Sequence, residues 1–92
     1  MTLSLRRDVV LNEVDDGLVL LDERTGRYWH LNGTAERMLR ELLAGHSPAE
    51  TAHRLTAVPA GGRPVDDEFR NRVTTDVQAF VDGLVRAKLV TR

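Results

Sequence analysis

The chain has 92 residues, a net charge of −1 and no cysteine. This length predicts one domain over residues 1–92, which buries roughly 60–65% of the surface that its unfolded chain exposes. The absence of cysteine excludes disulfides and thiolate metal sites, and the near-neutral charge gives no strong attraction to nucleic acid or to an anionic membrane. No apolar run has the length of a signal peptide or a membrane span, so we expect a cytoplasmic protein.

Three strand-like segments come first. Residues 5–14 carry apolar side chains on both alternations, and residues 18–21 form an apolar run typical of a central strand. After a turn that contains Gly26, residues 28–31 mix aromatic, basic and apolar side chains, as an edge strand does. Because the connections are short, the sequence predicts a sheet in the order 1-2-3. One side of the third strand is then left unpaired.

Two helices follow the predicted sheet. Asn32 is a typical N-cap, and the helix that it starts runs to about Ala44, with Gly45 as its stop signal. The segment Ser47–Glu50, SPAE, is a capping box with proline at the first helical position. It predicts a short second helix that ends near Thr56.

A loop and a longer helix complete the chain. The composition of residues 58–64, VPAGGRP, predicts a loop, and acidic residues mark the start of a third helix over 66–87. Gly83 lies inside this helix, and the sequence gives no evident reason for a glycine there. After the helix, Leu89 and Val90 are expected to close the core. The apolar residues of the helix span an arc of roughly 160°, whereas a surface helix needs a stripe of about 100°. They are Phe69, Val73, Val77, Phe80, Val81, Leu84 and Val85.

Catalytic or metal-binding groups are poorly represented. The three histidines, His30, His46 and His53, match no zinc-binding spacing and are better explained as surface residues. The only serines are Ser4 near the terminus and Ser47 at the predicted cap. Neither a nucleophile elbow nor a phosphate-binding loop is present. We therefore expect no catalytic residue, no metal and no cofactor.

Two binding functions remain. Strands followed by three helices are typical of winged-helix DNA-binding proteins, but the third helix carries acidic and basic residues in balance and would repel phosphate about as much as attract it. The other function is peptide binding by strand addition to the third strand. About four or five backbone hydrogen bonds, at roughly 0.5–1.5 kcal/mol each, fall short of the −8 kcal/mol of a micromolar Kd, so two or three apolar anchors are also needed. On periodicity alone, the broad apolar arc fits a filled core equally well.

Four motifs, in order and at plausible spacing, resemble the PqqD-like family. They are Gly17–Asp22, Thr25–Asn32, Gly45–Glu50 and Asp76–Leu84. The resemblance implies a RiPP precursor recognition element with an α+β, winged-helix-like fold, in which a three-stranded antiparallel sheet precedes three helices. Such proteins bind the leader segment of a ribosomally synthesised precursor peptide.

The chain is most similar to the stand-alone leader-binding protein of lasso-peptide biosynthesis. In that pathway the leader typically carries a Tyr-x-x-Pro motif, and the partner is a separate cysteine-type leader peptidase. The alternative within the family is a peptide chaperone for a radical-SAM enzyme of pyrroloquinoline quinone biosynthesis. A third reading is an obligate subunit whose apolar surface only docks a larger enzyme.

The resemblance also implies a location for the leader, as an added antiparallel strand along the third strand and over the third helix. The strand residues would be Tyr28, Trp29 and His30. The groove wall would come from the N-terminal half of the third helix, with Arg72 and Asp76 at its polar margin. Asp76 could equally make a structural bond within the domain. The expected wall comprises Arg72, Val73, Asp76, Val77 and Phe80.

Overall fold

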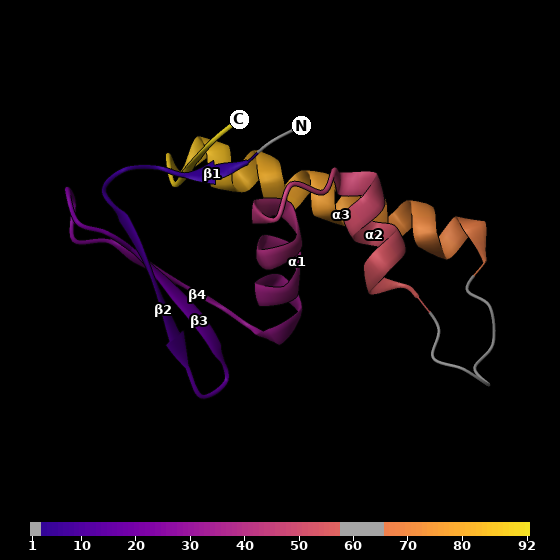
Figure 1. The fold of residues 1–92 in the computed structure, drawn as a ribbon, viewed down its shortest axis with the longest axis horizontal. Helices are drawn as coiled ribbons and strands as arrows, with labels where there is room; N and C mark the ends of the chain where they lie inside the picture. Colours follow the sequence, from indigo (N-terminus) through magenta and orange to yellow (C-terminus); the bar gives the residue numbers. More distant parts are fainter. Residues whose placement is uncertain (1–2, 58–65) are drawn as a thin grey trace.

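The structure is a computed structural model that describes residues 3–57 and 66–92. A β-sheet projects from one side of a helical layer, and α3 runs the length of that layer (Figure 1). This arrangement confirms the predicted α+β class with three strands before three helices. The elements in chain order are β1 (Ser4–Leu5), β2 (Val9–Val14), β3 (Gly17–Asp22), β4 (Tyr28–Leu31), α1 (Gly33–Leu43), α2 (Pro48–Leu55), α3 (Asp67–Arg86) and β5 (Val90–Thr91).

The main sheet is antiparallel in the order β2-β3-β4, as predicted. Leu18 and Leu20 of the central strand β3 are fully buried, which explains the apolar run in that segment. The outer strand β4 pairs with β3 from Tyr28, opposite Leu21, to Leu31, opposite Leu18.

The N-terminal segment differs from the prediction of one strand over residues 5–14. The chain turns before β2, where the Val9 N–H donates to the Arg6 C=O at 3.0 Å. Residues Ser4–Leu5 instead form β1, which pairs with β5 in a second, two-stranded sheet. The alternation of side chains could not reveal this break, because the pairing partner of β1 lies at the other end of the chain.

The predicted helix caps are present. The Asn32 side chain accepts a hydrogen bond from the N–H of the third residue of α1 at 2.9 Å. Asp66, expected as the first residue of the third helix, is instead the N-cap of α3, where its side chain accepts from the N–H of the third helical residue at 2.7 Å. At α2 the hydroxyl of Ser47 accepts from the Glu50 N–H while the Glu50 carboxylate accepts from the Ser47 N–H, both at 3.1 Å. The predicted loop over 58–64 lies outside the described residues.

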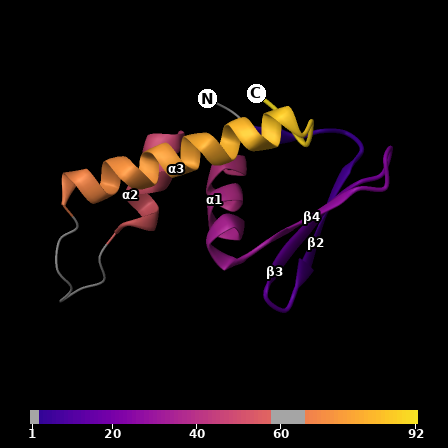
Figure 2. The same cartoon turned by 180° about the vertical axis from the view of Figure 1, so that it is seen from behind.

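The core lies between β3, α1 and α3, and α3 also packs on α2. Figure 2 shows α3 passing across the other two helices, with its C-terminal end nearest the sheet. Leu89 and Val90 are buried and close the core after α3, as predicted. No helix in residues 3–57 and 66–92 is long and apolar enough to cross a membrane.

Candidate functional site

The edge of β4 that faces away from β3 is unpaired. Within the described parts of the chain, the sheet ends at β4, and neither the N-terminal nor the C-terminal strand covers it, because β1 and β5 pair with each other. An unpaired strand edge presents a row of backbone donors and acceptors that can pair with another chain. The edge predicted from the sequence is therefore open in the structure.

The backbone alternation of the sheet identifies which groups face this edge. The Asp22 N–H donates to the Arg27 C=O at 2.9 Å, so Arg27 bonds toward β3. In an antiparallel pair, successive residues bond alternately toward and away from the partner strand. Trp29 therefore also bonds toward β3. The N–H and C=O groups of Tyr28 and His30 point outward, free to bond with an added strand.

Beside this edge, a groove of about 320 Å³ separates β4 from the C-terminal half of α3. Trp29 and Leu31 point into it from the same face of β4, as period-two alternation requires. We call this hollow the β4–α3 groove. It is lined by Trp29, Leu31, Phe80, Gly83, Leu84, Ala87 and Leu89. All of these residues are apolar, so the groove suits apolar side chains of a bound segment.

Gly83 leaves the β4–α3 groove open. A Cβ atom added at this position would meet no heavy atom within 4 Å, so packing does not demand a glycine. Glycine inside a helix is destabilising by roughly 0.5–1 kcal/mol relative to alanine. Gly83 lines the groove together with Trp29 and Phe80. A larger side chain at this position would project into the open space, which explains why glycine is found here despite its cost to the helix.

The structure brings together only part of the apolar site expected from the sequence. Trp29 and Phe80 line the groove together. Val77 is completely buried, so it supports α3 from within the core and does not line an open surface. Val73 is partly buried against the same core. The groove thus lies beside the C-terminal half of α3, because the N-terminal half extends away from the sheet along α2 (Figure 1).

The polar residues of the expected wall lie elsewhere on α3. Arg72 and Asp76 line a separate surface hollow on the N-terminal half of the helix. The Arg72 guanidinium lies 5.7 Å from the centre of the Phe69 ring, within the range of a cation–π interaction. Neither Arg72 nor Asp76 lines the β4–α3 groove.

The side chains of Tyr28 and His30 lie on the opposite face of β4 from Trp29. The Tyr28 residue is 70% exposed. The Nε2 atom of His30 lies 3.2 Å from Oδ1 of Asp16, which follows β2. Both residues therefore offer their backbone groups to the edge, while their side chains point away from the groove.

Five groove residues were not predicted from the sequence as site residues: Leu31, Gly83, Leu84, Ala87 and Leu89. The signal that could have revealed them is Gly83, because a destabilising residue inside a helix often has a packing or functional reason.

As for metals, residues 3–57 and 66–92 contain no cluster of three or more histidine or acidic side chains suited to binding an ion.

Comparisons with known proteins agree on one family. The family model described as coenzyme PQQ synthesis protein D (PqqD) matches residues 17–90. A solved lasso peptide synthetase B1 complexed with the leader peptide is 35% identical, with a TM-score of 0.82 and 100% of both chains covered. TbiB1 in complex with the TbiA(beta) leader peptide is 29% identical, with a TM-score of 0.75, covering 98% of this chain and 94% of that one. No curated protein matches the sequence.

Proposed function

Because this chain belongs to the PqqD family, we propose that it is a recognition protein that binds the leader segment of a ribosomally synthesised precursor peptide. The leader adds to the sheet as an antiparallel strand along β4, and its apolar side chains enter the β4–α3 groove. The observation that carries this proposal is the open edge of β4 directly beside an apolar groove. It is supported by the two similar solved structures, which are both complexes with leader peptides.

The magnitudes are compatible with this mode of binding. The outward groups of Tyr28 and His30 offer two N–H donors and two C=O acceptors, and each hydrogen bond contributes roughly 0.5–1.5 kcal/mol net. This is less than the −8 kcal/mol that a micromolar Kd requires. Two or three apolar side chains in the groove, at roughly 1.5–3 kcal/mol each, supply the remainder and offset the ordering of the peptide.

Within the family, the proposed pathway is lasso-peptide biosynthesis in the cytoplasm. The protein has no catalytic role of its own in this proposal; it presents the leader to a separate cysteine-type leader peptidase. Full-length similarity to a lasso peptide synthetase B1 favours this pathway. The family description favours the alternative, a peptide chaperone for a radical-SAM enzyme of pyrroloquinoline quinone biosynthesis.

The direct test is a titration with a synthetic leader that carries the Tyr-x-x-Pro motif. Trp29 is the only tryptophan of the chain and lies in the groove, so its fluorescence reports on occupancy. We expect saturable binding with a sub-micromolar to low-micromolar Kd. A leader from a pyrroloquinoline quinone pathway, titrated in parallel, should bind more weakly. If neither peptide binds, the proposed function is wrong.

The position of the groove is tested by two matched substitutions on α3. Phe80→Ala removes a groove residue and should weaken leader binding by about tenfold or more, which corresponds to about 1.4 kcal/mol. Phe69→Ala makes the same chemical change outside the groove, at an exposed site on the N-terminal half of the helix. It should leave the Kd unchanged. Equal weakening by both changes, with folding verified by circular dichroism, would contradict the placement.

A further inference from the structure

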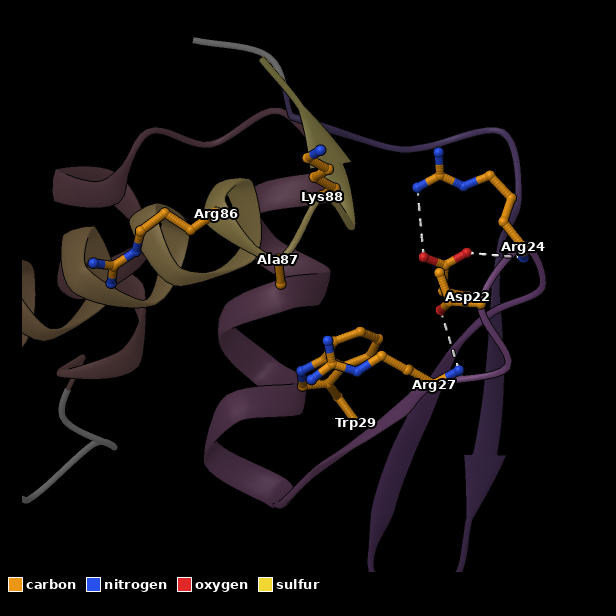
Figure 3. A pocket seen from close by; sticks show the side chains of 8 residues that line it. Asp22, Arg24, Arg27, Trp29, Arg86, Ala87 and Lys88 are labelled. Atoms are coloured by element: carbon orange, nitrogen blue, oxygen red, sulfur yellow. Dashed lines mark hydrogen bonds and ion pairs between the residues drawn. The ribbon is translucent and has the colours of Figure 1, made fainter.

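A second cavity, of about 510 Å³, continues the β4–α3 groove past the start of β4. The two share Trp29 and Ala87, so a chain lying along β4 would pass from one to the other. We call this second cavity the cationic pocket. Its lining residues, shown in Figure 3, are Asp22, Arg24, Thr25, Arg27, Trp29, Arg86, Ala87 and Lys88.

The one acidic residue that lines the cationic pocket is already compensated by Arg24. Asp22 accepts a hydrogen bond from the Arg24 N–H at 3.0 Å, and the Arg24 guanidinium lies 3.5 Å from its carboxylate. Burial opposes ionisation of Asp22, but the hydrogen bonds from Arg24 outweigh it and hold the pKa of Asp22 below its ordinary value. Arg24 also lies 3.8 Å from Asp8. Asp8, Asp22 and Arg24 together carry two negative charges and one positive charge, so any excess positive charge in the pocket comes from its other cations.

The remaining cations have no such compensation. Arg27, Arg86 and Lys88 make no ion pair with any residue in the described ranges 3–57 and 66–92. Figure 3 shows Arg27 lying along Trp29, with its guanidinium 5.5 Å from the ring centre, and Lys88 across the pocket from Arg24. The Arg86 side chain extends away along α3. Arg27 and Lys88 are thus the two unpaired charges available to a ligand.

Lys88 holds this position in an unusual backbone conformation. Its φ is 60°, and among the described residues it is the single non-glycine residue with a positive φ. It occupies the position after the helix cap in a Schellman turn, in which the Leu89 N–H donates to the Leu84 C=O and the Lys88 N–H to the Val85 C=O, both at 3.0 Å. Glycine is the usual residue there, because it adopts this conformation without strain. A strained residue at a candidate site suggests that its side chain serves a function.

We propose that the cationic pocket binds a carboxylate side chain, aspartate or glutamate, of the bound leader. This inference rests on the proposed function. The start of β4 adjoins the cationic pocket, and its end at Leu31 adjoins the groove. An antiparallel leader therefore places its groove-filling residues first and its acidic residue after them. Arg27 and Lys88 then form charge-assisted hydrogen bonds with the carboxylate, which are shorter and stronger than those between neutral groups.

The test uses synthetic Tyr-x-x-Pro peptides that differ at one position. Glutamate or glutamine is placed in turn at each position that follows the apolar residues, and each pair is titrated by Trp29 fluorescence. At one position, glutamate should bind about fivefold or more tightly than glutamine. Arg27→Gln and Lys88→Gly should each reduce this preference. Lys88→Gly also suits the positive φ, so it removes the charge without strain in the turn.

Arg37→Gln is the control matched to Arg27→Gln. Arg37 is exposed on α1 and lines neither the groove nor the cationic pocket. The control should keep the full preference for glutamate. If every peptide binds but glutamate has no advantage at any position, the inference is wrong and the proposed function stands. A glutamate preference that survives both Arg27→Gln and Lys88→Gly would place the carboxylate elsewhere and also overturn the inference. If no peptide binds, both proposals fail.

Discussion

Two substitutions at Gly83 should separate the effect on stability from the effect on leader binding. Replacing an interior helical glycine by alanine stabilises a helix by about 0.8–1 kcal/mol. A Cβ atom here meets no heavy atom within 4 Å, so no steric clash opposes this gain. For a domain of this size, about 1 kcal/mol raises Tm by roughly 4–8 °C. We therefore expect Gly83→Ala to raise Tm by several degrees with little change in leader affinity.

Leucine favours the helical conformation nearly as much as alanine does, so Gly83→Leu should also stabilise the helix. Unlike alanine, it extends a long side chain into the β4–α3 groove. It should displace one apolar anchor of the leader, worth roughly 1.5–3 kcal/mol, and so weaken binding by about 10- to 150-fold. Thermal melts and Trp29 fluorescence titrations of the two variants measure both quantities. Because Gly83→Leu should melt no earlier than the parent, its loss of affinity could not be attributed to unfolding.

Two results would refute this reasoning. If Gly83→Leu binds the leader as tightly as the parent does, the groove is not where the peptide's apolar residues lie. If Gly83→Ala lowers Tm, the space beside Gly83 is filled, and the explanation of this glycine as an opening in the groove is wrong.

Two further predictions concern stability. Val77→Asp buries a carboxylate in the core and should unfold the domain, seen as loss of the cooperative melt by circular dichroism; a folded variant that lost only leader binding would contradict the core position of Val77. The Ser47 N–H, hydrogen-bonded to the Glu50 carboxylate, holds the pKa of Glu50 below its ordinary value of 4.5. The stabilisation is therefore present above about pH 4.5 and lost as pH falls through the lower folded-state pKa, so Glu50→Gln should flatten the decline of Tm with acid. An unchanged acid profile would contradict this assignment.

Local signals predicted most of the fold. The capping residues Asn32 and Ser47 and the apolar run of β3 each depend on neighbours within a few residues, and the structure confirms all of them. The pairing of β1 with β5 was missed because it joins the two ends of the chain. No periodicity within residues 5–14 carries information about such a partner.

The candidate site was harder to predict than the fold. A helical projection identifies the apolar face of α3 but not which half of the helix lies beside β4. The wall implied by the family resemblance lay on the N-terminal half, and it included Val77, which is buried, and Arg72, which lines a separate hollow. Trp29 and Phe80, also expected in the site, do line one groove. The cationic pocket combines the β3–β4 turn with the C-terminal end of α3, so its charges are scattered in the sequence and meet only in the folded chain.

The central claim, strand addition at β4, is tested most directly by amide hydrogen exchange with NMR detection. In the free protein the outward N–H groups of Tyr28 and His30 should exchange quickly, while that of Trp29 is protected by its bond toward β3. Saturation with the leader should slow exchange at Tyr28 and His30 and leave Trp29 as it was. If Tyr28 and His30 still exchange quickly in the saturated complex, the leader binds without joining the sheet.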